Sequence, residues 1–258
     1  IKNMGVHFPS VTIVIPTYNQ AQFLDKALSS IFQQNLVVEV FVMDGGSTDG
    51  SLDIIRAWEH RLSGWRSHPD NGQAAAINEG VAKGVAPYVC WLNSDDWFLP
   101  GGLAKLVDVL KQDPKLPAVY GRTWTFVERK NKQFPTWVER FNKDRLALRC
   151  IISQPASLIQ RRVWEKVGGL DPTLHMAMDY DLWWKILKFS GPLEFFNDFV
   201  AVNREHSATK TNTKRRQHYQ EAMKIVRKYH GYVPLKWWLF KPYAVWFKTI
   251  VNWTATHL

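Results

Sequence analysis

Cysteine is scarce in this 258-residue chain, which contains two, Cys90 and Cys150. Two cysteines so far apart form neither a spaced metal-ligand pair nor a disulfide framework, and they favour a reducing compartment in which each is a small apolar side chain. Residues 1–10 lack the apolar stretch of a secretory signal. No Gly-x-Gly-x-x-Gly or Walker loop occurs, which argues against a dehydrogenase or a nucleotidyltransferase. Nucleic-acid-binding motifs are also missing, so no nucleic-acid partner is expected.

Acidic residues are scarce in the C-terminal part of the chain. The formal net charge is +10, which predicts attraction to an anionic partner such as a phosphorylated small molecule or a phospholipid surface. Only Glu205 and Glu221 oppose the basic residues of this part, which are Arg204, Lys210, Lys214, Arg215, Arg216, Lys224, Arg227, Lys228, Lys236, Lys241 and Lys248. We therefore expect the anionic partner to meet the C-terminal third.

Apolar segments alternate between strand and helix periodicity over the first half of the chain. The expected strands are Val11–Ile15, Val37–Met43, Trp65–Ser67 and Tyr88–Leu92. Helices are predicted at Gln22–Phe32, around Leu52 to Trp58, at Ala74–Val85, and from a first-turn Pro100 through Leu110. This alternation predicts an α/β fold with a mainly parallel sheet. Beyond Pro117 the segments are mixed, with Ala118–Val127 and a helix near Met178–Leu187.

Four polar clusters follow the predicted strands. They are Pro16-Thr17-Tyr18-Asn19, Asp44 to Gly50, Asp70-Asn71-Gly72 and Asn93-Ser94-Asp95-Asp96. One such cluster is typical of any turn. Four on the carboxyl edge of one sheet predict a ligand site. The adjacent carboxylates Asp95 and Asp96 suit Mn²⁺ or Mg²⁺, and the alternative is that they cap the helix that follows.

In this order the motifs resemble those of family 2 glycosyltransferases, of the bacterial polysaccharide and O-antigen type. Besides the four clusters, the resemblance rests on Arg162 to Asp171 and on Asp179-Tyr180-Asp181-Leu182-Trp183, and it covers roughly Val11 to Ser207. It implies a GT-A fold: a Rossmann-like, mainly parallel mixed sheet flanked by helices, with a C-terminal helical extension. Residues 1–117 would form the nucleotide-sugar-binding half, 118–210 the acceptor half of the same domain, and 211–258 the extension.

The resemblance also implies roles for individual residues. Asp44 would hydrogen-bond the base, Asp95 would face the ribose and diphosphate, and Asp96 would bind the metal, with Asp95 and His206 close to it. For His206 a purely structural role is the alternative. The rest of the nucleotide and donor site would be Pro16, Thr17, Tyr18, Asn19, Gly46, Asp70, Gly72, Asn78, Asn93 and Ser94.

Asp179 matches the position of the catalytic base in inverting members of the family. Met178 stands where Glu is common, so the acceptor contacts are expected to differ. The alternative is that Asp179 and Asp181 are solvent-facing acids at a helix start. Gln154 and Pro155 resemble an acceptor-binding loop, or form an ordinary turn. The Gln-x-x-Arg-Trp motif of processive synthases is absent, because Val163 and not an arginine precedes Trp164. A single sugar addition is therefore expected.

The expected donor is a nucleotide sugar, most simply a UDP-sugar, and the expected acceptor is a glycan or glycolipid. A non-catalytic carbohydrate- or nucleotide-binding protein is the alternative. Placed on a helix, Tyr243, Trp246, Phe247, Ile250 and Trp253 oppose Lys241, Val245, Lys248 and Asn252. Such a helix would lie on an anionic membrane surface, or pack on protein. We expect a cytoplasmic protein, peripheral on the inner face of the cell membrane.

Overall fold

The computed structural model describes residues 8–206, 209 and 213–247. Its N-terminal half alternates strands and helices as the sequence predicts. The order is β1 (Val11–Thr17), α1 (Ala21–Phe32), β2 (Val38–Asp44), α2 (Ser51–Trp58), η1 (Glu59–Arg61), β3 (Gly64–Ser67), α3 (Gln73–Lys83) and β4 (Tyr88–Trp91). All seven residues of β1 are buried, as expected for a parallel strand with both faces covered.

The second half adds antiparallel strands and further helices. It contains β5 (Trp97–Phe98), α4 (Gly102–Gln112), β6 (Ala118–Val127), η2 (Glu128–Lys130), β7 (Lys132–Pro135), α5 (Lys143–Leu148), η3 (Gln154–Ala156), β8 (Ser157–Gln160), α6 (Arg161–Val167), α7 (Met178–Ser190) and β9 (Glu194–Glu205). The helices α9 (Arg215–His230), α10 (Leu235–Lys241) and η4 (Pro242–Phe247) follow.

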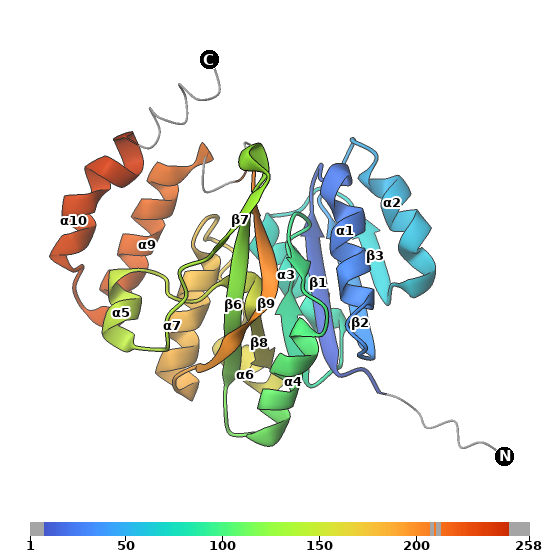
Figure 1. The fold of residues 1–258 in the computed structure, drawn as a ribbon, viewed down its shortest axis with the longest axis horizontal. Coiled ribbons are helices and arrows are strands. Elements are labelled where there is room, and N and C mark those ends of the chain that lie inside the picture. The colour runs from blue at the N-terminus through green and yellow to red at the C-terminus, as the bar shows by residue number, and fades with distance from the viewer. Residues whose placement is uncertain (1–7, 207–208, 210–212, 248–258) are drawn as a thin grey trace.

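One sheet runs through both halves of the described chain, in the order β3-β2-β1-β4-β8-β6-β9-β5, with β7 paired to β6. Strands β1 to β4 pair in parallel, β8 is antiparallel to both of its neighbours, and β9 runs parallel to β6. Figure 1 shows the helices on both faces, with α9 and α10 lying beyond α7. Since β1, β2 and β4 are parallel, their carboxyl ends bring the predicted polar clusters to one edge.

A separate apolar core covers each face of the sheet. On one face α1, α2 and α4 pack against the strands. On the other face α3, α6, α7 and α9 pack around three large side chains, Trp91, Trp164 and Trp183. The Trp91 and Trp183 rings stack with their centroids 6.2 Å apart. The C-terminal helix α9 therefore belongs to the same core as α3, α6 and α7.

The helix that was expected to start at Pro100 begins two residues later. Gly101 is its N-cap and adopts a left-handed conformation with φ of 68°. A Cβ on Gly102 would lie 2.3 Å from the carbonyl oxygen of Val200 in β9. The close approach of the helix start to β9 therefore fixes where α4 begins, and Pro100 stays outside it.

The helix predicted over the tail also differs from the observed structure. Val245, expected beside the lysines, is 6% exposed, whereas Trp238, Leu239 and Phe240 in the preceding helix α10 are 54%, 68% and 51% exposed. At Pro242 a π-helix replaces the α-helix. Because a π-helix has more residues per turn, the side chains no longer fall on the faces that a continuous α-helix predicts. The side chains of Trp246, Phe247, Ile250 and Trp253 lie outside what the structure describes, as do Lys248 and Asn252. Within the described residues, no helix is long and apolar enough to cross a bilayer.

Candidate active site

A cleft of about 910 Å³ opens at the carboxyl edge of the sheet. It brings together most residues that the sequence assigned to a ligand site. Those on the donor side are Pro16, Thr17, Tyr18, Gly46, Asp70, Gly72, Asn93, Ser94, Asp95, Asp96 and His206, and those on the other side are Gln154, Pro155, Met178 and Asp179. The predicted donor and acceptor residues therefore line one continuous cavity.

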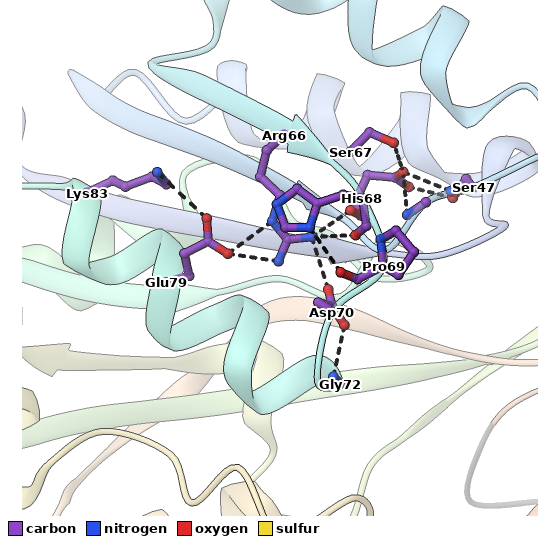
Figure 2. A network of polar contacts seen from close by, with 11 residues as sticks. Ser47, Arg66, Ser67, His68, Pro69, Asp70, Gly72, Glu79 and Lys83 are labelled. Carbon is purple, nitrogen blue, oxygen red and sulfur yellow. Dashed lines mark hydrogen bonds and ion pairs between the residues drawn. The ribbon is translucent and has the colours of Figure 1, made fainter.

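Two loops form the end of the cleft that was predicted to bind the donor, and a buried carboxylate and a guanidinium hold them (Figure 2). The Asp44 carboxylate accepts hydrogen bonds from the Gly46 and Ser47 amides at 3.0 and 2.9 Å and from the Ser67 hydroxyl at 2.6 Å. Arg66 donates to the Asp44 carbonyl at 2.6 Å. The end of β2 and the end of β3 are thereby joined into one rigid wall.

Arg66 also holds the second loop. Its guanidinium pairs with Asp70 at 3.0 Å and with Glu79 of α3 at 2.9 Å. Asp70 in turn accepts the Gly72 amide at 2.9 Å, and Gly72 has a φ of 100° that only glycine adopts readily. One arginine thus fixes the loop from β3 to α3 from both ends.

Three residues predicted for the donor site do not line the cleft. Asp44 is fully buried, with its carboxylate occupied by its own loops, so contact with a base remains a prediction. Asn19 binds the neighbouring loop. Its backbone N–H donates to Ser47 Oγ at 2.7 Å, and its side-chain oxygen accepts from the Thr48 backbone N–H. Asn78 binds both backbone groups of Leu170, at 2.8 and 3.0 Å, and so ties α3 to the segment before α7.

The two adjacent carboxylates lie in different environments. Asp96 is 2% exposed, and its oxygens accept the Arg204 amide at 2.9 Å and the Asn93 side chain at 3.3 Å. The Asp95 side chain is 21% exposed, and its Oδ2 lies 3.1 Å from His206 Nε2. Burial, together with the neighbouring Asp95 charge, raises the pKa of Asp96 well above its ordinary value. All three residues line the cleft, and the Asp95 carboxylate is the more exposed of the two acids.

Asp95 and His206 could supply two of the ligands of a divalent cation. Among the described residues, no group of three or more His, Cys, Asp and Glu side chains could hold a metal ion. A carboxylate oxygen and an imidazole nitrogen 3.1 Å apart nevertheless match ligand types that Mn²⁺ accepts. Because ions of this kind keep open positions for phosphate oxygens, two protein ligands with a bound diphosphate fit such a site.

Arg204 lies beside this pair but is held by the protein. Its guanidinium donates to the Asp95 carbonyl at 3.1 Å and pairs with Glu128 at 3.2 Å. It also lies 4.5 and 4.9 Å from the ring centroids of Phe23 and Trp97. Its side chain therefore fixes the turn after β4. Lys210, another of the basic residues expected to meet an anionic partner, lies outside the described residues.

Asp179 lies at the start of α7 on the opposite wall of the cleft. Burial raises the pKa of its carboxyl, and the charge of His218 in α9 opposes that rise. Burial lowers the pKa of the His218 imidazole, and the nearby Asp179 carboxylate opposes this change. A carboxylate with a raised pKa and a weakly solvated environment is a stronger base than an exposed aspartate.

Asp181 does not face solvent as expected for an acid at a helix start. It is 1% exposed and pairs with Lys185 at 3.3 Å and with Lys228 of α9 at 3.2 Å. The fourth residue of the helix is buried in this structure, where two lysines compensate its charge. One of the basic residues assigned to an external partner, Lys228, is thus used inside the fold.

Helix α9 also fixes the loop that leads to Asp179. Glu221, 9% exposed, accepts the amides of His175, Met176 and Ala177 at 3.3, 2.8 and 3.0 Å. These amides precede α7, so the Glu221 carboxylate positions the helix start that carries Asp179. Sequence reasoning missed Glu221 and His218, because nothing local marks a residue that acts on a loop about 45 positions away.

Gln154 connects the segment before β8 to the end of β4. Its amide donates to the Trp91 carbonyl at 2.8 Å, and its oxygen accepts from Asn93 at 3.3 Å. The segment Gln154–Ala156 is a 3-10 turn that leads directly into β8. It is both a turn and part of the cleft lining, as are Pro155 and the nearly buried Met178.

Two solved structures show which class of protein has this fold. The S. aureus TarS fragment 1–349, in complex with UDP-GlcNAc, has a TM-score of 0.70 at 15% identity, covering 85% of this chain and 66% of that chain. The Pyrobaculum calidifontis mannosyltransferase PcManGT, in complex with GDP-Man and Mn²⁺, has a TM-score of 0.66 at 21% identity, covering 96% of this chain and 72% of that one. The fold is that of the GT-A glycosyltransferases.

Sequence similarity then gives the family. Residues 12–168 match the model of glycosyl transferase family 2, which is more than half of the chain, and the chain belongs to this family. An uncharacterized glycosyltransferase of Rickettsia typhi is 28% identical over 219 residues, covering 81% of this chain and 68% of that relative. The chain spans only 33 to 36% of three longer rickettsial relatives.

Proposed function

We propose that this glycosyltransferase uses a nucleotide-diphosphate sugar, a UDP-sugar in the simplest case, and transfers the sugar to an acceptor hydroxyl with inversion at the anomeric carbon. The observation that carries this proposal is that the Asp95 and His206 pair and Asp179 line one cleft. The ligands of TarS and PcManGT support a nucleotide-sugar donor.

The loops around Asp44 and Arg66 would hold the nucleoside end of the donor, with the diphosphate directed toward Asp95. Asp95 and His206 would hold Mn²⁺ or Mg²⁺, which when bound neutralises charge on the departing diphosphate. This assignment moves the main metal ligand from Asp96 to Asp95, because both Asp96 oxygens accept hydrogen bonds within the protein. Asp96 would instead orient the turn.

Asp179 would act as the general base. The acceptor hydroxyl gives its proton to the Asp179 carboxylate while its oxygen bonds to the anomeric carbon. On the opposite side of that carbon, the bond to the diphosphate breaks, and the diphosphate leaves with the electron pair. One displacement of this kind inverts the anomeric centre. Gln154, Pro155 and Met178 would line the acceptor end.

The acceptor we propose is a polysaccharide or a lipid-linked glycan at a membrane surface. The exposed face of α10, with Trp238, Leu239 and Phe240, carries lysines at both ends, Lys236 and Lys241. Apolar side chains next to cations suit the interface of an anionic bilayer. This face would hold the protein on the inner surface of the cell membrane.

The experiment that tests the enzyme is a comparison of UDP binding and UDP-sugar hydrolysis with and without Mn²⁺. We expect tight UDP binding by calorimetry only with Mn²⁺ present, and about tenfold or greater weakening in Asp95→Asn, since a charged metal ligand is lost. A matched control is Asp113→Asn, an exposed acid outside the cleft. Metal-independent UDP binding without any hydrolysis would favour the non-catalytic nucleotide-binding alternative.

A further inference from the structure

A fixed tryptophan stands at the acceptor end of the cleft. Trp137 lines the cavity and is 63% exposed. Its indole nitrogen donates to Glu139 Oε1 at 2.6 Å, so the ring is held in one orientation although solvent reaches most of it. A large aromatic ring that is exposed and yet oriented by a charged hydrogen bond is suited to receive a ligand.

The carboxylate that orients the indole is itself fixed. Arg145 donates to both oxygens of Glu139, each at 2.7 Å. Mainly through these hydrogen bonds, the pKa of Glu139 is lowered to about 2, so the carboxylate is ionised at neutral pH and accepts strongly. The Tyr120 hydroxyl binds the Glu139 carbonyl at 2.7 Å, which anchors the same segment to β6.

A cation accompanies the exposed ring. The Arg149 guanidinium lies 5.0 Å from the Trp137 ring centroid and makes one long hydrogen bond, 3.4 Å, to the Trp137 carbonyl. In the part of the chain that the structure describes, Arg149 is in no ion pair within 4.0 Å, unlike Arg145. Its remaining N–H groups are therefore available on the cleft side, where it is one of the lining residues.

The pair is adjacent to the proposed base. Cys150, next to Arg149 in the chain, lines the cleft together with Asp179. The two groups are close enough that the Asp179 charge helps to raise the pKa of the Cys150 thiol, after the larger effect of burial. The Tyr180 hydroxyl also donates to the Leu146 carbonyl, so the first turn of α7 is attached to α5, the helix that ends at Arg149.

We propose that Trp137 and Arg149 form an acceptor subsite for an acidic sugar. The indole packs against the apolar face of the sugar ring, and the guanidinium pairs with its carboxylate or phosphate. Planar guanidinium groups bind either anion through two parallel hydrogen bonds. A neutral sugar would cover the same cation without compensating its charge, which is unfavourable. The inference rests on the proposed function, since it names the acceptor class of that site.

The test uses the full chain with Mn²⁺ and UDP, and measures glycan binding by surface plasmon resonance. The probes are an oligosaccharide with a terminal uronate, the same oligosaccharide after carboxyl reduction, and one with a terminal sugar phosphate. We expect at least one acidic probe to bind about tenfold or more tightly than the neutral probe, as for a charge-assisted hydrogen bond. The stronger of the two acidic probes identifies the anion.

The variants separate the ring from the charge. Arg149→Gln should remove the preference for the acidic probe while neutral binding stays within twofold. Trp137→Ala should weaken every probe, and Trp137→Phe should restore most of the binding. The matched control is the pair Phe134 and Lys130, an exposed ring with a cation 5.7 Å from its centroid on the neighbouring hairpin, outside the cleft. Phe134→Ala and Lys130→Gln should change nothing.

The result distinguishes this inference from the proposed function. Equal binding of acidic and neutral probes, no binding of any probe, or unchanged selectivity in Arg149→Gln would overturn the acidic subsite. Mn²⁺-dependent UDP binding in the same samples reports on the donor site and should be identical in wild type and in every variant. Its absence from the wild type would instead count against the proposed function. Since donor binding also verifies folding, each variant gives a usable result.

Discussion

At the scale of single residues, environment separates carboxylates that look alike in the sequence. Asp44, Asp95, Asp96 and Asp179 all follow or precede regular elements in polar motifs. The structure buries Asp44 in hydrogen bonds from its own loop and Asp96 in hydrogen bonds from Asn93 and the distant Arg204 amide, whereas Asp95 and Asp179 line the cleft and are less buried. The sequence could predict the four positions but not this division, because the deciding partner of Asp96, the Arg204 amide, lies 108 residues away.

Replacing the proposed base is the first prediction. Asp179→Asn keeps the shape of the side chain and removes its ability to accept a proton. We expect UDP-sugar hydrolysis, and transfer to any acceptor, to fall about 10²–10⁴-fold. UDP binding by calorimetry should stay within twofold, because Asp179 lies on the acceptor wall. Full activity in this variant would show that another group takes the proton.

The pH dependence of hydrolysis gives the second prediction. The base works ionised, so the rate rises with pH through the pKa of Asp179, which burial raises above the ordinary 3.8. The His218 charge lowers that pKa, so His218→Asn should move the acidic limb of kcat/KM to higher pH. His230→Asn, on the same helix but packed against Trp184, should leave the limb in place. A shift toward lower pH would contradict the assignment.

At the scale of elements, the sequence predicts strands and helices well where their periodicity is regular. Strands β1, β2 and β4 are apolar runs closed by polar residues, and these three and the short β3 are found at the predicted places. The long strand β9 mixes acidic, aromatic and apolar residues, and it is held by pairing with β6 through two register shifts. Such a strand is set by its partner and not by its own pattern, so it could not be predicted.

Helix α9 illustrates the same limit for the site. Its basic composition indicated an external partner, yet Glu221, His218 and Lys228 all act on α7 or on the loop before it. The hydrogen bonds of Glu221 and Lys228 join residues 44 to 47 positions apart, and no local motif marks them. The Trp137 and Arg149 pair was likewise missed, because single exposed aromatic residues are common on protein surfaces.

The third prediction concerns this helix. Glu221→Ala leaves the His175, Met176 and Ala177 amides without their acceptor, and of these the Ala177 amide is buried, where an unsatisfied N–H costs about 1–3 kcal/mol. We expect a lower free energy of unfolding by that amount in urea, with hydrolysis reduced more than UDP binding. Lys224→Ala, exposed on the same helix, is the control and should match the wild type. Equal loss of UDP binding would mean that the effect is global.

At the scale of the whole molecule, charge and exposed apolar side chains gather at the end of the described chain. On the proposed membrane surface, the formal charge of +10 would attract the protein to anionic lipid at long range, and salt would screen this attraction. Exposed apolar side chains on α10 would add a short-range contribution. Salt weakens the electrostatic contribution, and substitution of the α10 side chains removes the apolar one, so the two can be measured separately.

The fourth prediction tests them by co-sedimentation with vesicles. We expect binding to phosphatidylglycerol vesicles, little binding to phosphatidylcholine vesicles, and a clear decrease at high salt. Replacing Trp238 and Phe240 together by Ala should weaken binding about tenfold or more, as expected when aromatic anchors leave the interface. Phe189→Ala, which removes a ring 49% exposed on α7, should have no effect. Salt-insensitive binding to neutral vesicles would refute the electrostatic part.

The hydrogen bonds between Glu221 and the residues before Asp179 decide where truncated or chimeric forms of this enzyme can end. The family match stops at residue 168, but a fragment that ends there would lack Asp179. A fragment that ends before α9 would keep Asp179 and lose Glu221, which holds the loop before α7. Chimeras that exchange acceptor preference between relatives should therefore move α7 and α9 together as one cassette. A boundary after His230, where α9 ends, keeps both halves of that unit.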